Sequence, residues 1–238
     1  MSFFTFNGKS NEEFNLKLGQ GIEYATSSND LERVTVPGRD GELLIYNNRR
    51  KAVEQSFPLL LVKEKGSATD IIPEITEWLS VKGFRDMSFS WDKEHIYKGA
   101  YLEGFSVEET LKQFGKTKLN FLLHPIKYRK DGFNRLNLSN NSIILGKGNV
   151  MSDPVITIRG NGDGVLTING RQTKFKNVQG VIVFDMQKKL VYSGNLPAWD
   201  KVVRSPQYVL PKLDPGENRI SWTGNFIVEL IPYWGVMI

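Results

Sequence analysis

Two histidines, His95 and His124, are the side chains of this sequence best suited to acid–base chemistry near neutral pH. They lie 29 residues apart, each within or at the end of a predicted strand, and the serine-nucleophile motif Gly-x-Ser-x-Gly does not occur in the sequence. A catalytic histidine needs a nucleophile or a second acid–base group within hydrogen-bonding reach. Because the sequence indicates no such partner, we expect a protein that is not an enzyme.

Other segments resemble binding or catalytic motifs but lack an essential part. Gly115-Lys116-Thr117 ends like a phosphate-binding loop, yet Thr110 stands where that loop needs a glycine. The 160–164 segment is similar to a calcium-binding repeat, but a single copy cannot surround the ion with oxygen ligands. The pairs Glu12-Glu13 and Glu108-Glu109 are adjacent in predicted strands, so their carboxylates point to opposite faces. We therefore expect no cofactor, no metal site and no catalytic residue.

Composition indicates a chain with a packed core. Hydrophobic residues make up 40% and aromatic residues 11% of the 238 residues, and mean hydropathy is −0.32. No apolar run is long enough to span a membrane, so we expect no membrane insertion. The segment 1–8 lacks the basic start and apolar block of a secretory signal, which favours synthesis in a cytoplasm. Cysteine is absent, which excludes disulfides, thiol catalysis and cysteine metal sites.

The charge of the chain is moderately basic and is not concentrated. Net charge is +5 with an isoelectric point near 9.2, and the densest basic run is only Arg49-Arg50-Lys51. Nucleic-acid-binding proteins gather basic residues on one face or in one run. We therefore expect no specific nucleic-acid binding.

The 36–51 segment predicts a protruding arm. Pro37 fixes one turn dihedral, while Gly38 and Gly41 permit backbone angles that other residues avoid, so the charged residues between them are pushed outward. Such an arm is suited to gripping a neighbouring subunit rather than to forming a pocket. The candidate interface residues are Pro37, Gly38, Arg39, Asp40, Gly41, Glu42, Tyr46, Arg49, Arg50 and Lys51.

Periodicity predicts a β-rich first half with one helix. Alternating apolar residues predict strands at 22–25, 31–36, 52–65, 95–107 and 116–128, with Gly66 ending the third. Pro73 fits a first helical turn, and Lys82-Gly83 fits a helix end. Apolar residues at helical spacing place Trp78 in the core. The expected fold is an α+β N-terminal domain over residues 1–130, β-rich with one packed helix and an extended arm.

The second half predicts an all-β domain after a linker. Residues 131–152 are rich in Asn, Ser and Gly and predict a linker or crossover. From residue 153 to 238, short strands alternate with turns, including a turn at 160–164 and the hairpin signal Asn169-Gly170. Turn signals at this spacing predict a β-sandwich.

Segments at both ends of the chain resemble one known family. They are Phe4-Thr5-Phe6-Asn7-Gly8, the Pro37–Glu42 turn, Leu213–Trp222 and Glu229–Trp234. No motif is chemically specific alone, but their order and spacing resemble the distal tail protein (Dit) family of siphophages, the long-tailed bacteriophages, of Gram-positive bacteria. The similarity covers the layout of nearly the whole chain.

This resemblance implies a structural hub in the virion, at the tail tip or baseplate, assembled in the cytoplasm of the bacterial host. Members of the family form a hexameric ring whose N-terminal domains stack on the major tail tube protein and meet the tail-associated lysin or tail fibre protein. Their C-terminal domains are galectin-like jelly rolls that project outward, where a receptor-binding protein or baseplate component docks. The chain is too short for the carbohydrate-binding module inserted in bulkier members, so the resemblance implies the compact form.

A second function remains open from the sequence: a carbohydrate-binding adhesion protein acting through the C-terminal β-sandwich. Exposed aromatic rings stack on sugars, and the same residues also serve as core or as contacts with a partner protein. The candidate residues are Trp199, Trp222, Tyr233 and Trp234.

Overall fold

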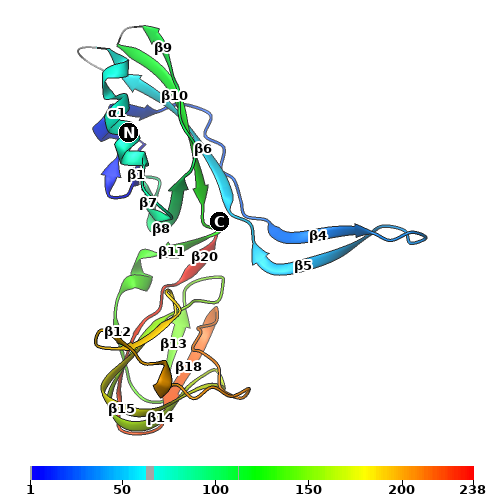
Figure 1. Ribbon diagram of the computed structural model, residues 1–238, viewed down its shortest axis with the longest axis vertical. Coiled ribbons are helices and arrows are strands. Elements are labelled where there is room, and N and C mark those ends of the chain that lie inside the picture. The colour runs from blue at the N-terminus through cyan, green and yellow to red at the C-terminus, as the bar shows by residue number, and fades with distance from the viewer. Residues whose placement is uncertain (1, 63–66, 112) are drawn as a thin grey trace. The chain divides into compact units, whose positions relative to one another are not determined.

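The computed structural model describes residues 2–62, 67–111 and 113–238, and within them the chain is mostly β with a single α-helix. The chain divides into two compact units (Figure 1). Unit 1 comprises residues 1–127 and 237–238, and unit 2 comprises residues 128–236. The chain passes into unit 2 within β11 (Ile126–Arg129) and returns within β20 (Gly235–Met237).

Unit 1 is built on one sheet, which also includes β11 and β20. The remaining strands of this sheet are β1 (Phe4–Phe6), β2 (Lys9–Ser10), β3 (Leu16–Leu18), β6 (Val53–Val62), β7 (Arg85–Phe89), β8 (Asp92–Tyr101), β9 (Val107–Leu111) and β10 (Phe114–Leu123). Their order is β2-β1-β7-β8-β10-β6-β3, with β9 added beside β10 and β11 beside β8. The expected strand at 22–25 does not form, because the Gln55 side chain bonds that backbone instead: its Nε2 donates to Glu23 O at 2.7 Å. The expected strand end at Lys65 and Gly66 lies outside the described residues.

Aromatic side chains fill the core of unit 1. β6 and β10 pair antiparallel along their whole length and turn alternate residues inward, as period-two patterning requires. The ring of Phe4 stacks on Phe57 at 4.9 Å between centroids and on Trp78 at 6.0 Å. Such stacked and edge-to-face pairs add to the stabilisation from burial.

One helix covers this core. The 3-10 turn η2 (Ala68–Ile71) leads into α1 (Ile72–Leu79), which buries Ile75, Trp78 and Leu79. Trp78 Nε1 donates to Phe6 O at 2.9 Å, which satisfies its only polar atom. The predicted core position of Trp78 is confirmed, whereas the predicted end at Lys82-Gly83 is too late, because the backbone leaves helical geometry at Ser80.

The 3-10 helix η1 (Asn11–Phe14) begins with reciprocal caps. The Ser10 hydroxyl accepts from Glu12 N at 3.2 Å, and the Glu13 carboxylate accepts from Ser10 N at 2.7 Å. The expectation that Glu12 and Glu13 lie in a strand is therefore wrong.

Unit 2 is a curled eight-stranded sheet. Its strands are β12 (Leu136–Leu138), β13 (Ser142–Gly146), β14 (Val155–Ile168), β15 (Arg171–Asp185), β16 (Leu190–Ser193), β17 (Leu196–Pro197), β18 (Gly216–Trp222) and β19 (Ile227–Ile231), with 3-10 turns η3 (Lys130–Phe133) and η4 (Trp199–Lys201). The order is β12-β19-β14-β15-β16-β17, and β13 joins through β18 to β14.

The 131–152 segment is part of the sheet in unit 2 rather than a linker. β12 pairs with β19 and β13 pairs with β18, both antiparallel. Leu136, Leu138 and Ile144 pack against the buried core, which explains why this polar segment is ordered. The few apolar residues of the segment outweigh its Asn, Ser and Gly content.

The expected turn at 160–164 is instead a bulge within the continuous strand β14. The register of β14 against β15 shifts between Gly162 and Gly164. Gly160 has φ +148°, and a Cβ there would lie 2.6 Å from the Phe226 ring. On either side of the bulge β14 pairs first with β19 and then with β18, so the bend curls the sheet around its own core. The Asn169-Gly170 turn closes the β14–β15 hairpin as predicted, with positive φ at both residues.

Asn11 is the buried polar anchor of unit 1. Its Oδ1 accepts from Phe4 N at 2.7 Å and its Nδ2 donates to Leu16 O at 2.5 Å. Replacing Asn11 with Ala leaves both backbone groups buried without these partners, so we expect Asn11→Ala to lower the free energy of unfolding by about 2–3 kcal/mol. Urea unfolding followed by tryptophan fluorescence measures this. Gln20→Ala, at an exposed position, is the control, and an equal effect in both variants would contradict the assignment.

Candidate functional site

The most prominent feature of unit 1 is the hairpin formed by β4 (Asn29–Thr35) and β5 (Glu42–Arg50), which leaves the unit as a separate ribbon (Figure 1). We call residues 29–51 the arm. Among the described residues, β4 and β5 pair only with each other. The tip is a type II turn, since Arg39 N donates to Val36 O at 3.2 Å and Gly38 has φ +80°. Pro37 and Gly38 thus occupy the positions that this turn favours, as the sequence indicates.

Both faces of the arm expose apolar side chains. Cross-strand pairing joins Leu43 to Val34, and Tyr46 to Leu31. Because alternate residues point to opposite faces, Val34, Leu43 and Ile45 share one face, and Leu31, Leu44 and Tyr46 share the other. Tyr46 is 53% exposed, and all of β5 except its last residue is exposed. A two-stranded ribbon is marginal in water by itself, and an exposed apolar patch marks an interaction site.

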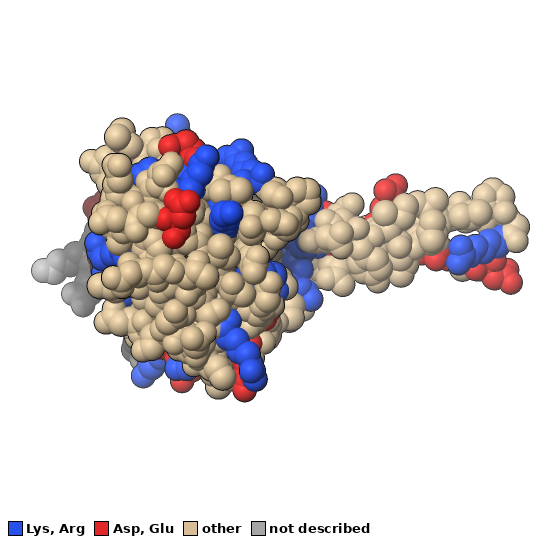
Figure 2. All heavy atoms as spheres, turned by 90° about the horizontal axis from the view of Figure 1, so that it is seen from below, with Lys and Arg blue, Asp and Glu red and all other residues tan. Residues whose placement is uncertain are grey.

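Charged side chains lie mainly at the two ends of the arm. Figure 2 shows the arm as a protrusion with a mostly uncharged shaft and both acidic and basic groups at its far end. At the base, Arg49 Nε donates to Asp30 Oδ2 at 2.5 Å, and this hydrogen bond lowers the pKa of Asp30. Arg50 Nη1 donates to Ser27 O at 2.9 Å, and Ser27 Oγ in turn donates to Ile238 O. Arg50 therefore helps fix the arm to unit 1.

These contacts change the expected roles of the arm residues. Arg49 and Arg50, predicted to pair across an interface, already have partners in their own chain. Glu42 lies 3.9 Å from Arg33, a loose and exposed pair. In the part of the chain that the structure describes, Arg39, Asp40 and Lys51 have no hydrogen-bonded or ion-paired partner for their side chains.

His95 belongs to a polar network centred on Asp92. His95 Nδ1 lies 2.6 Å from Asp92 Oδ1, and Asp92 Oδ2 accepts from Tyr97 Oη at 2.6 Å and from Lys127 Nζ at 2.7 Å. Burial alone would raise the pKa of Asp92, but the hydrogen bonds from Lys127, Tyr97 and His95 outweigh it and hold the pKa well below its usual range. Burial, together with Asp92, raises the pKa of Tyr97. Asp92 thus remains ionised and Tyr97 protonated, which suits a structural ion network.

The second histidine, His124, stabilises a turn. His124 Nδ1 accepts from Ile126 N at 3.2 Å, and the His124 ring packs edge-on against Phe84. Within the described ranges, His, Cys, Asp and Glu residues form no group of three that could hold a metal ion. Over the same ranges, no helix is long and apolar enough to cross a bilayer.

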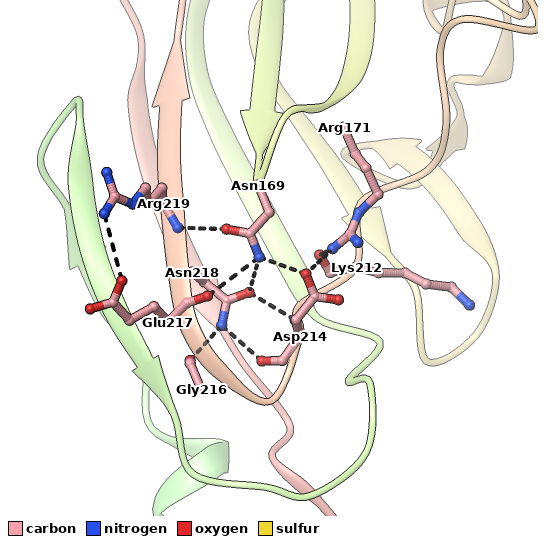
Figure 3. Close-up of polar contacts among 8 residues, drawn as sticks. All are labelled: Asn169, Arg171, Lys212, Asp214, Gly216, Glu217, Asn218 and Arg219. Carbon is pink, nitrogen blue, oxygen red and sulfur yellow. Dashed lines mark hydrogen bonds and ion pairs between the residues drawn. The ribbon is translucent and has the colours of Figure 1, made fainter.

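The 213–222 motif takes part in a hydrogen-bonded cluster within unit 2 (Figure 3). We call this cluster the polar lock; it comprises Asn169, Arg171, Asp214, Asn218 and Arg219. The fully buried Asn218 donates through Nδ2 to Asp214 O at 2.9 Å and accepts through Oδ1 from Asp214 N at 2.8 Å. Asn169, in the β14–β15 turn, donates to Asp214 Oδ2 at 2.6 Å and accepts from Arg219 N at 2.8 Å. Arg171 Nη2 donates to the same Asp214 oxygen at 2.8 Å. The motif therefore ties this turn to the start of β18, a role that the spacing of its residues did not indicate.

The four aromatic candidates for sugar contact do not form an exposed platform. Trp222 is 8% exposed and Trp234 is 4% exposed, so both belong to the core of unit 2. Trp199 is partly buried and carries the Arg204 guanidinium 5.0 Å from its ring centroid. Tyr233 packs edge-on against Phe133 at 5.0 Å. The expectation of sugar stacking on Trp222 is wrong, because burial removes the ring face that a sugar would need.

Structural comparison identifies a similar fold. The chain matches the SPP1 Dit (gp 19.1) protein with a TM-score of 0.77 over 98% of both chains, at 13% sequence identity. The fold resembles that of SPP1 Dit. The SPP1 protein is described as a paradigm of the hub adsorption apparatus of phages that infect Gram-positive bacteria. No protein-family model and no curated protein matches the sequence.

The Dit-like fold of unit 2 has a titratable element in its polar lock. The hydrogen bond from Arg171 is the main cause of a lowered pKa at Asp214. A carboxyl group with a lowered pKa stabilises the folded state above its unfolded pKa of about 3.9, and this contribution is lost as the pH falls through the folded value. We therefore expect the thermal midpoint of unit 2 to fall below about pH 4 more steeply in the wild type than in Asp214→Asn.

Calorimetric melts between pH 7 and pH 2.5 would measure this difference. Lys212→Gln is a suitable control, because in this cluster only the backbone carbonyl of Lys212 takes part in a hydrogen bond. Identical pH profiles for the wild type and Asp214→Asn would contradict the role assigned to the ion pair.

Proposed function

We propose that the chain is a distal tail protein that forms a hexameric ring, the structural hub of a siphophage tail tip or baseplate. The observation that carries this proposal is the match to SPP1 Dit over 98% of both chains. The equal coverage of the two chains also supports the compact form, without an inserted carbohydrate-binding module.

The arm supports ring formation on physical grounds. A closed ring needs a heterologous interface, in which one surface of a protomer binds a different surface of the next. An arm with apolar side chains on both faces is suited to be such a surface, because the described part of its own chain leaves both faces uncovered. In this proposal the interface consists of the tip Pro37–Glu42, the shaft residue Tyr46 and the base Arg49–Lys51.

The two units take different parts in the proposed assembly. Unit 1 forms the ring, stacks on the major tail tube protein and meets the tail-associated lysin or tail fibre protein. Unit 2 is a galectin-like sandwich that offers a docking surface to a receptor-binding protein or baseplate component. Its sheet, curled by the bulge in β14, supports this assignment. The protein then works at the virion tail tip after assembly in the host cytoplasm.

The mass of the purified protein tests the ring. Light scattering coupled to size exclusion should give a species of six times 27.1 kDa, seen as a ring in negative stain. A mass of one chain, both alone and with purified tail tube protein, would contradict the proposal.

Substitution of the arm shaft tests which surface makes the ring. Leu44→Ser together with Tyr46→Ser removes apolar area from one face of the arm, and each large side chain contributes about 1.5–3 kcal/mol when buried. We expect this variant to be folded by circular dichroism and to elute as a single chain. Leu196→Ser, at a position 72% exposed in unit 2, should leave the ring intact. A double variant that still forms rings would contradict the role of the arm.

A further inference from the structure

A small cavity in unit 1 is lined by several aromatic side chains and includes no residue of the arm. Its volume is about 210 Å³. On one wall, the Phe89 ring stacks on Trp91 at 4.8 Å between centroids and packs edge-on against Tyr97 at 4.6 Å. Phe57 and Leu123 add further apolar surface. Because four of these five side chains are rigid aromatic groups, the space that they enclose suits a flat apolar group.

Tyr24 lies at the mouth of this cavity. It is 66% exposed, and its ring meets Trp91 edge-on at 6.2 Å between centroids. The buried side chain of Gln55 holds the backbone on either side of Tyr24. Its Nε2 donates to Glu23 O at 2.7 Å, and its Oε1 accepts from Ala25 N at 3.4 Å. These two hydrogen bonds keep the exposed tyrosine ring beside the cavity.

Lys127 gives the cavity a hydrogen-bond donor. Lys127 and Tyr97 both line the cavity, and Lys127 Nζ donates to Tyr97 Oη at 2.9 Å and to Asp92 Oδ2 at 2.7 Å. An ammonium group has three N–H donors, so one remains, and no described residue accepts it. The Asp92 carboxylate already balances the Lys127 charge and would repel a second carboxylate nearby. The remaining donor therefore favours a neutral acceptor, such as a carbonyl or hydroxyl oxygen.

We infer that this cavity binds a small molecule with one aromatic ring and a neutral hydrogen-bond acceptor, of the size of benzamide. An apolar cavity of about 150 Å³ holds benzene, so a cavity of about 210 Å³ has room for a benzene ring with a short substituent. The bound ring packs between Tyr24 and the aromatic wall, and the substituent oxygen accepts from Lys127. This site goes beyond the hub proposal and needs no second copy of the chain, so its test is independent of ring formation.

Saturation-transfer NMR on the full chain tests the site with benzamide, which carries the aromatic ring and a neutral oxygen. We expect transfer from the protein to the benzamide ring protons, with a Kd of roughly 0.1–1 mM, which suits a ligand this small. Benzoate has the same shape but an anionic substituent, and we expect its Kd to be at least about threefold higher. Absence of transfer to benzamide would overturn the site. Equal or tighter binding of benzoate would overturn the assignment of a neutral acceptor.

Two variants test where the ligand binds. Ala25 lines the cavity, so Ala25→Phe directs a ring into it, and we expect this variant to lose the transfer signal. Tyr24→Ala removes the ring at the mouth and should raise the Kd for benzamide about threefold to tenfold, as loss of an aromatic contact does. Tyr46→Ala, at an exposed tyrosine of the arm, is the matched control and should leave this Kd unchanged.

Circular dichroism shows whether each variant is folded. Tyr24 is exposed, so Tyr24→Ala keeps the inference testable even if Ala25→Phe does not fold. The same Kd in the wild type, Tyr24→Ala and Tyr46→Ala would overturn the placement of the ligand. A rise in Kd confined to Tyr24→Ala, together with loss of signal in folded Ala25→Phe, supports it.

Discussion

The structure depends on one constraint: a two-stranded ribbon has two faces, and the described part of its own chain covers neither. Hydrogen bonding between β4 and β5 satisfies only one edge of each strand. Elsewhere in the described chain, large apolar side chains on long strands such as β6 and β14 point mainly inward. On β5, by contrast, both faces of the strand carry exposed apolar side chains. A third strand or a packed layer would stabilise such a ribbon. Neither exists within the chain as described, so both faces of the ribbon are open to solvent or to another molecule.

The polar residues whose types suggest catalysis instead make hydrogen bonds that stabilise the fold of their own units. Asp92 collects hydrogen bonds from His95, Tyr97 and Lys127 and stays ionised as a result. In unit 2, Asn218 and Asp214 hold a loop against the β14–β15 turn. A group whose hydrogen-bonding capacity is filled by its own fold has little left for a substrate. The polar groups of these two networks are thus engaged within their own units, whereas the apolar side chains of the arm are exposed.

The sequence predicted local features governed by backbone chemistry and missed those decided by distant contacts. The turn at Pro37 and Gly38, the hairpin at Asn169-Gly170 and the core position of Trp78 follow from local rules and are confirmed. The glycines at 160–164 were interpreted as a turn, because the sequence does not show that the Phe226 ring occupies the space beside Gly160. The 131–152 segment was interpreted as a linker, because its pairing with β18 and β19 joins residues about 70–100 positions apart. Likewise, nothing local to Arg49 or Arg50 indicates their bonds to Asp30 and Ser27.

The free energies of ion pairing and of apolar burial indicate which residues of the arm would contribute most to binding. An exposed ion pair contributes roughly 0.2–1 kcal/mol, whereas burial of a leucine or tyrosine side chain contributes about 1.5–3 kcal/mol. In the proposed ring, burial of the shaft residues Leu44 and Tyr46 would therefore contribute more affinity than exposed ion pairs at the tip or the base. Apolar faces alone would accept many registers, because sliding a ribbon along an apolar surface changes the buried area only slightly. Whether a chain of identical contacts closes into a ring or continues as a filament depends on the rotation that relates consecutive copies.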